Sequence, residues 1–308
     1  MKRKAIQLAK NTLVVSLPSS WVKRYGVKKG AELELEEIGA MLSVALTAQD
    51  DIKKVILDAS HLSERPLRWA ISGLHKQGFD QVEVRYESPK TADILHDLLR
   101  DTLLGFTVVS QRERVMILRQ VTRDADDQFD PVLRRAFLVT ISLAEGVADA
   151  ERRGDYDELK DLTILERTNN QLTNFCLRLI SKGKAGILHP HLYYTILWNL
   201  EKVADEYKYL VTALPKKHTL DKHSITLLQD TAQLVRLYYE LFFSSGTQLL
   251  NEFALRKTQV DEAAKKRLSG NAQQVLVAHH VCGIMTRLGD LASACMAMRS
   301  SDGAHDKS

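Results

Sequence analysis

The spacing of apolar residues differs between the front and the back of the chain. In residues 4–47, apolar and polar side chains alternate in short runs, as where Leu33 and Leu35 lie between glutamates, and this is the pattern of half-buried strands. Pro18 with two serines after it predicts the start of a short helix, which Gly26 ends. The expected order is strand, strand, helical turn, strand, strand.

The next segment, residues 51–121, predicts a small α/β layer. Amphipathic helices are expected at residues 66–77 and 89–104, with a strand before each of them and a hairpin at the end of the segment. The order β-α-β-α-β-β is typical of a sheet covered by helices. The segment contains no glycine-rich phosphate loop.

Behind an acidic, polar linker at residues 123–130, every long segment has a helical period. Between residues 188 and 214, apolar side chains recur in steps of three and four throughout. Six helices in two sets of three predict a duplicated three-helix bundle over residues 131–299, with a disordered tail at 300–308. The expected domains are an N-terminal module at 1–48, an α/β connector at 49–122 and this all-α bundle.

Composition limits the class of protein. Hydrophobic residues make up 44% and charged residues 27% of the chain, an ordinary balance for a soluble protein. No run approaches the roughly 20 apolar residues that span a bilayer, and the basic start lacks an apolar run with a cleavage site. We therefore expect a cytoplasmic protein with no transmembrane segment. The three cysteines (Cys176, Cys282 and Cys295) form no C-x-x-C motif and are expected to be reduced thiols.

Charge is unevenly distributed along the chain. Residues 1–30 contain eight lysines and arginines and no aspartate or glutamate. Such clustering is the usual electrostatic footprint of a protein that binds a polyanion, although a solvated basic surface gives the same pattern. The first 45 or so residues also hold too few apolar side chains for a core of their own. This module is therefore expected to need a second copy.

The order of features in residues 3–47 resembles the AbrB/MazE/SpoVT swapped-hairpin family. The matching features are a strand, Leu-Pro, a short helix, Gly-Val-Lys-Lys-Gly and an alternating strand. The resemblance implies that two chains exchange hairpins to form one DNA-binding β-barrel, and so a homodimer. The residues expected to contact DNA are Arg3, Lys4, Lys10, Asn11, Lys23 and Arg24. The alternative is a module that only dimerises or captures a partner protein.

Polar side chains are paired on two neighbouring predicted helices. Glu201 and Asp205 are four residues apart and share a helix face, and Glu166 and Asn170 have the same spacing on the preceding helix. Facing carboxylates on bundle helices are one way to hold a divalent metal or iron, whereas a solvated or partner-binding acidic face is the alternative. Asn169 projects onto the apolar stripe instead, which predicts a buried hydrogen-bond partner.

The helical half, over about residues 130–299, resembles the PhoU family. EKVAD at 201–205 and TRLGD at 286–290 are similar to the acidic motif that this family repeats on its bundle helices. In some members these acids bind iron or zinc. Thr286 stands here where the family has Glu, and Asn170 where Asp is usual. The resemblance therefore implies a metal set of Glu166, Glu201, Asp205 and Asp290.

The position of Asp290 weakens this set, because by helical phase it falls nearly opposite the apolar stripe of its own helix. The connector also resembles the segment that joins the two parts in archaeal PhoU-family regulators, in the stretch LSERPLRWAISGLHKQGFDQVEVRYESP.

Together the resemblances imply a regulator of phosphate uptake. It would bind DNA through the hairpin module, and its helical domain would sense or dock a component of the phosphate transport system. The competing hypothesis is a signalling scaffold of the PhoU type that uses the hairpin module only for dimerisation or protein docking. We expect no enzyme, because no nucleophile lies in a recognisable context and no nucleotide-binding loop occurs.

Overall fold

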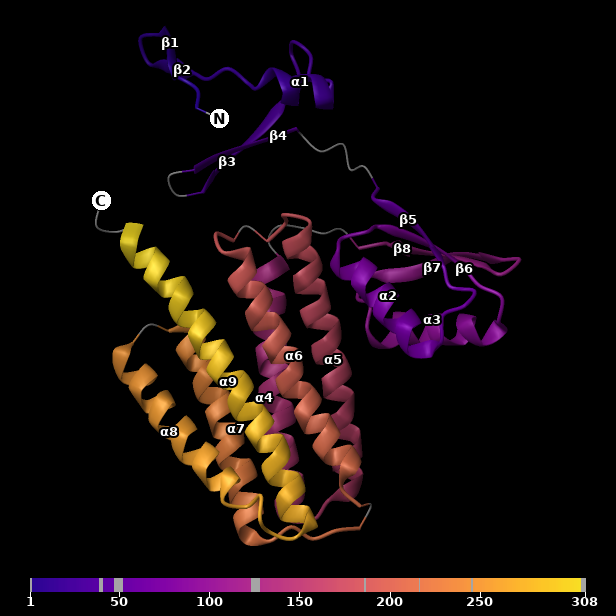
Figure 1. Cartoon of the computed structure of the whole chain (residues 1–308), viewed down its shortest axis with the longest axis vertical. Helices are drawn as coiled ribbons and strands as arrows, with labels where there is room; N and C mark the ends of the chain where they lie inside the picture. The colour runs from indigo at the N-terminus through magenta and orange to yellow at the C-terminus, as the bar shows by residue number, and fades with distance from the viewer. Residues whose placement is uncertain are drawn as a thin grey trace. The chain divides into compact units, whose positions relative to one another are not determined.

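The computed structural model describes residues 2–38, 41–46, 52–122, 128–185, 187–215, 217–244 and 246–305. The chain divides into two compact units, Met1–Asp51 and Ile52–Ser308. A small N-terminal sheet region is followed by a predominantly helical C-terminal part (Figure 1). The predicted mixed fold is confirmed at this level.

The first unit consists of two hairpins and a short helix. β1 (Ile6–Ala9) pairs with β2 (Thr12–Val14), β3 (Leu33–Ile38) pairs with β4 (Met41–Leu46), and both pairs are antiparallel. α1 (Ser19–Tyr25) separates the hairpins in the sequence, so the predicted order is confirmed. Each hairpin is a two-stranded sheet of its own, and no residue of this unit whose exposure is described is buried. The described residues of this unit therefore form no core within one chain, and an isolated two-stranded sheet is only marginally stable.

The second unit begins with a four-stranded sheet in the order β5-β6-β8-β7. Only β5 and β6 run parallel. One face buries Val82, Val84, Met116 and Leu118, and α2 and α3 cover it (Figure 1). The predicted order of elements is confirmed. Their bounds are β5 Lys54–Asp58, α2 Glu64–Lys76, β6 Gln81–Arg85, α3 Pro89–Asp101, β7 Phe106–Arg112 and β8 Val115–Gln120.

Six long helices complete the second unit. They are α4 Phe129–Arg153, α5 Tyr156–Ser181, α6 Pro190–Ala213, α7 Lys222–Phe243, α8 Thr247–Lys265 and α9 Ala272–His305. α4 packs on α5 and α5 on α6, while α7, α8 and α9 contact one another. Contacts of α4 with α7 and of α6 with α9 join the two sets into one helical body (Figure 1).

The helical period predicted the buried face of α6 correctly. Ile196, Leu200, Val203 and Tyr207 follow steps of three and four and are all buried. α9 continues to His305, within the segment 300–308 that is predicted from the sequence to be disordered. Once the apolar face of a helix is packed, each further residue adds a hydrogen bond at little cost, and the helix can extend past its core contacts.

The buried asparagine of α5 behaves as predicted. Asn169 is fully buried and donates through Nδ2 to Oγ1 of Thr140 on α4 at 2.7 Å. A second, longer contact of the same Nδ2 reaches the carbonyl oxygen of Ala136 at 3.4 Å. These contacts satisfy the donor of a buried polar side chain and fix the register of α5 against α4.

Candidate functional site

The expected DNA-binding residues lie at three places in the first unit. Arg3 and Lys4 precede β1, Lys10 and Asn11 form the turn between β1 and β2, and Lys23 and Arg24 end α1. The β1–β2 turn is held by Gln7, whose Nε2 donates to the carbonyl oxygens of Ala9 at 3.2 Å and Lys10 at 3.0 Å. All six predicted side chains belong to exposed residues.

Local geometry explains how α1 presents its two cations. Gly26 adopts a left-handed conformation with φ 64° and closes the helix directly after Tyr25. Lys23 and Arg24 therefore lie in the last turn, where the negative end of the helix dipole favours cations. Among the described residues, neither makes an ion pair, and neither do Arg3 and Lys4. Their charges are available to an outside anion.

The carboxylates expected to bind metal meet lysines instead. Glu166 on α5 and Asp205 on α6 are both buried, and Nζ of Lys208 lies between them, 2.6 Å from Glu166 Oε1 and 2.8 Å from Asp205 Oδ1. Asn170 also donates to Glu166 Oε1 at 2.6 Å. Lys202 donates to Asp205 Oδ2 at 2.8 Å. The lysines thus occupy the space between the acids that a metal cation would need.

The pKa shifts in this cluster follow from burial and from these contacts. Burial raises the pKa of Glu166, and the hydrogen bond from Lys208 only partly opposes that shift. Burial acts in the same direction on Asp205, but hydrogen bonds from Lys202 and Lys208 outweigh it and lower its pKa. The stable arrangement is therefore an ionised Asp205 between two ammonium groups, with Glu166 the more easily protonated acid.

The structure does not assemble the four-residue metal set. Glu201 on α6 contacts other cations, 3.2 Å from Lys202 Nζ of its own helix and 4.0 Å from Lys76 Nζ of α2. Asp290 on α9 is 54% exposed and has Arg287 as its neighbour at 4.0 Å. Within the described ranges, no group of three or more His, Cys, Asp or Glu side chains could hold a metal ion. The residues present therefore do not fit the predicted metal.

A polar stripe on α5 joins the bundle to the α/β layer. Its members recur every four residues, so neighbouring members lie side by side and the stripe winds around the helix. They are Glu166, Asn170, Asn174 and Arg178, with Lys182 directly after the helix ends. Toward its C-terminal end the stripe contacts the loops and helices beside the sheet: Asn174 Nδ2 lies 3.4 Å from the carbonyl oxygen of Thr102. Next to the stripe, Gln171 Nε2 donates to the carbonyl oxygen of Arg100 at 2.6 Å.

Arg178 is the centre of this junction and is not among the site residues predicted from the sequence. Its side chain is fully buried, pairs with the carboxylate of Asp80 and donates to the carbonyl oxygen of Phe79 at 2.6 Å. Lys182 donates to the same carboxylate at 2.6 Å. Burial alone would raise the pKa of Asp80, but Lys182, the backbone N–H of Lys53 and the charge of Arg178 lower it. One available signal was an arginine inside the otherwise apolar run FCLRLI.

A second buried ion pair lies at the far end of α4. His218 Nε2 is 2.9 Å from Glu151 Oε2, and both side chains are almost fully buried. His218 Nδ1 is 2.8 Å from the carbonyl oxygen of Pro215, so both ring nitrogens face acceptors. Two arrangements satisfy both acceptors: either each ring nitrogen carries a proton, or one nitrogen does and Glu151 is protonated and donates to the other. Burial raises the pKa of Glu151.

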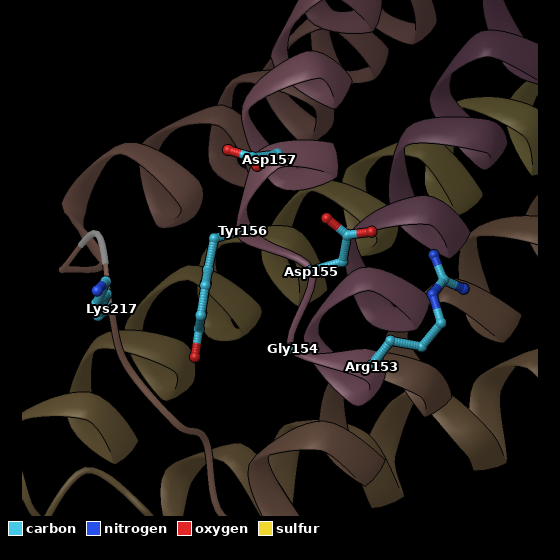
Figure 2. A pocket seen from close by; sticks show the side chains of 6 residues that line it. All are labelled: Arg153, Gly154, Asp155, Tyr156, Asp157 and Lys217. Atoms are coloured by element: carbon cyan, nitrogen blue, oxygen red, sulfur yellow. The ribbon is translucent and has the colours of Figure 1, made fainter.

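A surface pocket opens beside this pair. Arg153, Gly154, Asp155, Tyr156, Asp157 and Lys217 line it (Figure 2). Figure 2 shows Tyr156 between Lys217 and the backbone turn at Gly154, and its hydroxyl donates to the carbonyl oxygen of His218. The lining holds two cations and two carboxylates, and Arg153 is already paired with Glu158. The pocket therefore has no net preference for an anion or a cation, and it contains none of the predicted site residues.

One helix bears on the expectation that no segment spans a membrane. In the part of the chain that the structure describes, Ala272–Arg299 of α9 is long and apolar enough to do so by length and composition alone. This stretch packs on α6, α7 and α8, as a core helix of a helical body does.

Comparisons of the chain with protein-family models, with curated proteins and with solved structures found no match.

Proposed function

We propose that this chain is a DNA-binding regulator of phosphate uptake, with an AbrB/SpoVT-like module followed by a PhoU-like helical domain. The observation that carries the DNA-binding part is the exposed, unpaired cationic surface of the first unit. Among residues 1–30 no carboxylate competes with a phosphate for these cations. Backbone phosphates dominate the affinity of such surfaces for DNA, and a contact from Asn11 adds base recognition.

The proposed DNA-binding form is a homodimer. The first unit has no buried residue among those described, and its two hairpins are separate sheets, so one copy cannot hold apolar strands away from water. Exchange of hairpins between two chains would supply the missing core and close the sheet edges into a barrel. A two-fold dimer would also present two copies of the cationic surface to a duplex.

The helical domain is proposed to sense or dock a component of the phosphate transport system in the cytoplasm. Within the second unit, a change at the bundle can reach the α/β layer through α5, because Arg178 and Lys182 bind Asp80 there. A partner shifts this junction only if it binds one of its arrangements better than another. The charged cluster at the α5–α6 junction serves as a structural contact in this proposal.

The test is fluorescence-polarisation binding of the full chain to a labelled duplex from its own promoter, with random duplex as competitor. Five cations on each of two chains give about ten phosphate contacts, hence a slope of roughly −9 in log affinity against log salt. Affinity should fall roughly 10⁵-fold between about 50 and 200 mM salt. Binding that survives the random competitor supports a sequence-reading regulator.

The matched variants are two triple charge reversals. Arg3→Glu/Lys4→Glu/Lys10→Glu reverses three of the five proposed cations of each chain, and Arg135→Glu/Lys160→Glu/Lys222→Glu makes the same charge change on exposed helical residues. We expect the first variant to lose binding and the second to keep the affinity within a few-fold. Equal losses of DNA affinity in the two variants would show that binding depends on the net charge of the chain and not on the first unit. No binding by the unaltered chain at low salt would leave the scaffold hypothesis, in which the first unit only dimerises or docks a protein.

A further inference from the structure

The strand β5 lies at one edge of the four-stranded sheet, where β6 is its single neighbour. Its register with β6 is regular, and the strand contains no proline. Ile56 in its middle is 57% exposed, and the residues at both ends of the strand are exposed as well. A regular, exposed, apolar edge strand is a template for pairing with a strand of another chain.

The backbone of β5 turns alternate residues toward its open side. The carbonyl oxygen of Lys53 accepts from the backbone N–H of Asp80 at 2.7 Å. The backbone N–H of Ala59 donates to the carbonyl oxygen of Arg85, also at 2.7 Å. Both contacts are on the β6 side, so the odd-numbered residues face β6. The even-numbered residues of Lys54–Asp58 therefore direct their N–H and C=O groups to the open edge.

The side chains of β5 form a pattern that is complementary to itself. The strand reads Lys-Val-Ile-Leu-Asp, with a cation at one end and an acid at the other. When two such strands run antiparallel around Ile56, Lys54 of each copy lies opposite Asp58 of the other. Val55 then lies opposite Leu57, and Ile56 lies opposite its own copy. Opposite charges and apolar side chains are the cross-strand pairs that stabilise a sheet.

Both terminal charges of β5 are available to a second copy. Lys54 and Asp58 are exposed, and within the described ranges neither makes an ion pair. Asp58 accepts from the backbone N–H of Ser60 at 3.0 Å, and this hydrogen bond lowers its pKa, so the acid is ionised at neutral pH. Arg85 lies beside Asp58 on β6 but is paired with Glu83 at 2.8 Å.

The opposite edge of the sheet is different. The register of β7 is irregular between Val108 and Ser110, where Val109 is left outside the ladder. A bulge of this kind bends an edge strand and is one way in which proteins prevent edge pairing. The sheet thus has one protected edge, β7, and one open edge, β5.

We propose that β5 pairs with β5 of a second copy, antiparallel and centred on Ile56, so that the two sheets become one. In this register the outward N–H and C=O groups of Lys54, Ile56 and Asp58 all bond to the partner strand, because opposite residues of a hydrogen-bonded pair exchange both groups. A strand of this length is a small contact. The pairing therefore rests on the homodimer proposed above, which supplies the second copy at an effective concentration on the order of millimolar.

Disulfide formation between single cysteines tests this register in the full chain. The background is Cys282→Ser, which removes the one thiol that is not buried. Ile56→Cys places two thiols opposite one another with Cα atoms about 5.5 Å apart, within disulfide range. In Lys54→Cys the two thiols are separated by the length from Lys54 to Asp58 along a strand, roughly 13 Å, and cannot be joined.

The control for the other edge is Val109→Cys on β7, where the natural residue is 43% exposed. With oxidised glutathione as the oxidant, Ile56→Cys should form the linked dimer about tenfold faster than Lys54→Cys and Val109→Cys, because only its thiols meet at disulfide distance. The linked dimer is measured by non-reducing gel electrophoresis.

Charge reversal tests the pairing of Lys54 with Asp58. In the Ile56→Cys chain, Lys54→Glu places two acids opposite one another at both ends of the paired strands and should slow linking about tenfold. Asp58→Lys should also slow it, because two lysines then meet. Lys54→Glu/Asp58→Lys restores opposite charges and should recover most of the rate. A double variant as slow as the single variants would overturn the proposed register.

Sedimentation velocity separates this proposal from the homodimer on which it rests. A dimeric chain in which Ile56→Cys links no faster than the controls overturns β5 pairing and leaves the dimer of the first unit standing. A monomeric chain without linking overturns both. A dimer that Lys54→Glu converts to monomers supports β5 pairing and overturns dimerisation through the first unit.

Discussion

Replacement of Arg178 by methionine tests whether the polar junction on α5 holds the α/β layer against the helices. Methionine keeps the unbranched apolar stem of the side chain but not the guanidinium, and so removes the charge and every donor. The Asp80 carboxylate would keep Lys182 at 2.6 Å and the backbone N–H of Lys53 at 2.9 Å. The carbonyl oxygen of Phe79 would lose the donor that Arg178 supplies at 2.6 Å.

The expected magnitude follows from these partners. The two shorter hydrogen bonds of Arg178, to Asp80 and to the carbonyl oxygen of Phe79, contribute about 1.5–3 kcal/mol each, and removal of a buried guanidinium returns part of that free energy. Arg178→Met should therefore lower the free energy of unfolding by about 2–4 kcal/mol. Asp80→Ala should cost more, about 3–5 kcal/mol, because it leaves a fully buried guanidinium without a carboxylate. The double variant should cost less than the sum of the two single changes.

Urea unfolding of the full chain, followed by far-ultraviolet circular dichroism, measures these differences. Native-state hydrogen exchange adds the location: amides of α2 and β6 should exchange faster in Arg178→Met than amides of α8, which has no contact with the junction. The matched control is Arg167→Met on the exposed side of α5, whose contact with Asp101 is 3.7 Å long and solvent-exposed. If Arg178→Met lowers the free energy of unfolding by less than about 1 kcal/mol, or by no more than the control does, Arg178 does not hold the α/β layer against the helices.

Other charged contacts in the helical part carry three more expectations. Lys208→Met should lower the free energy of unfolding by about 1–3 kcal/mol at neutral pH. Burial raises the pKa of Glu166, so the deficit should shrink as the pH falls and Glu166 is protonated, and urea titrations at two pH values measure this. Asp221→Ala should cost about 1–2 kcal/mol by thermal unfolding, since Asp221 caps α7. Partial burial would raise the pKa of Asp221, but hydrogen bonds at the helix start outweigh it and lower this pKa. The contribution of Asp221 to the free energy of unfolding is therefore present above pH of about 4 and is lost on acidification. Glu151→Leu and His218→Leu should each cost about 3–5 kcal/mol, and the double variant clearly less than their sum.

The pattern of apolar positions predicted the order of elements in both units. Alternation identified the strands around Leu33 and Leu35, and steps of three and four identified the buried face of α6. These predictions succeed because helix and strand periods are local properties that each segment carries in its own side chains. Asn169 was predictable for the same reason, since a polar residue on an apolar stripe must find a partner in the core.

The charged sites depended on which helices meet and at what register. From the sequence, Glu166 and Asp205 were acids on neighbouring helices, and nothing local indicated that Lys208 would lie between them. Asp80 and Arg178 are 98 residues apart, and only the packing of α5 against the α/β layer brings them together. Asp290 lies apart from the acids of α5 and α6 because its place on α9 faces outward, as its helical phase indicated.

The sequence by itself determined the type and order of the elements, the basic start of the chain and the lack of a core in the first unit. The tertiary structure decided which charges neutralise one another, and it turned a predicted metal site into lysine–carboxylate contacts. The physical reason is one of range. Periodicity and net charge are sums over neighbouring residues, whereas an ion pair forms only when two distant side chains meet within about 4 Å.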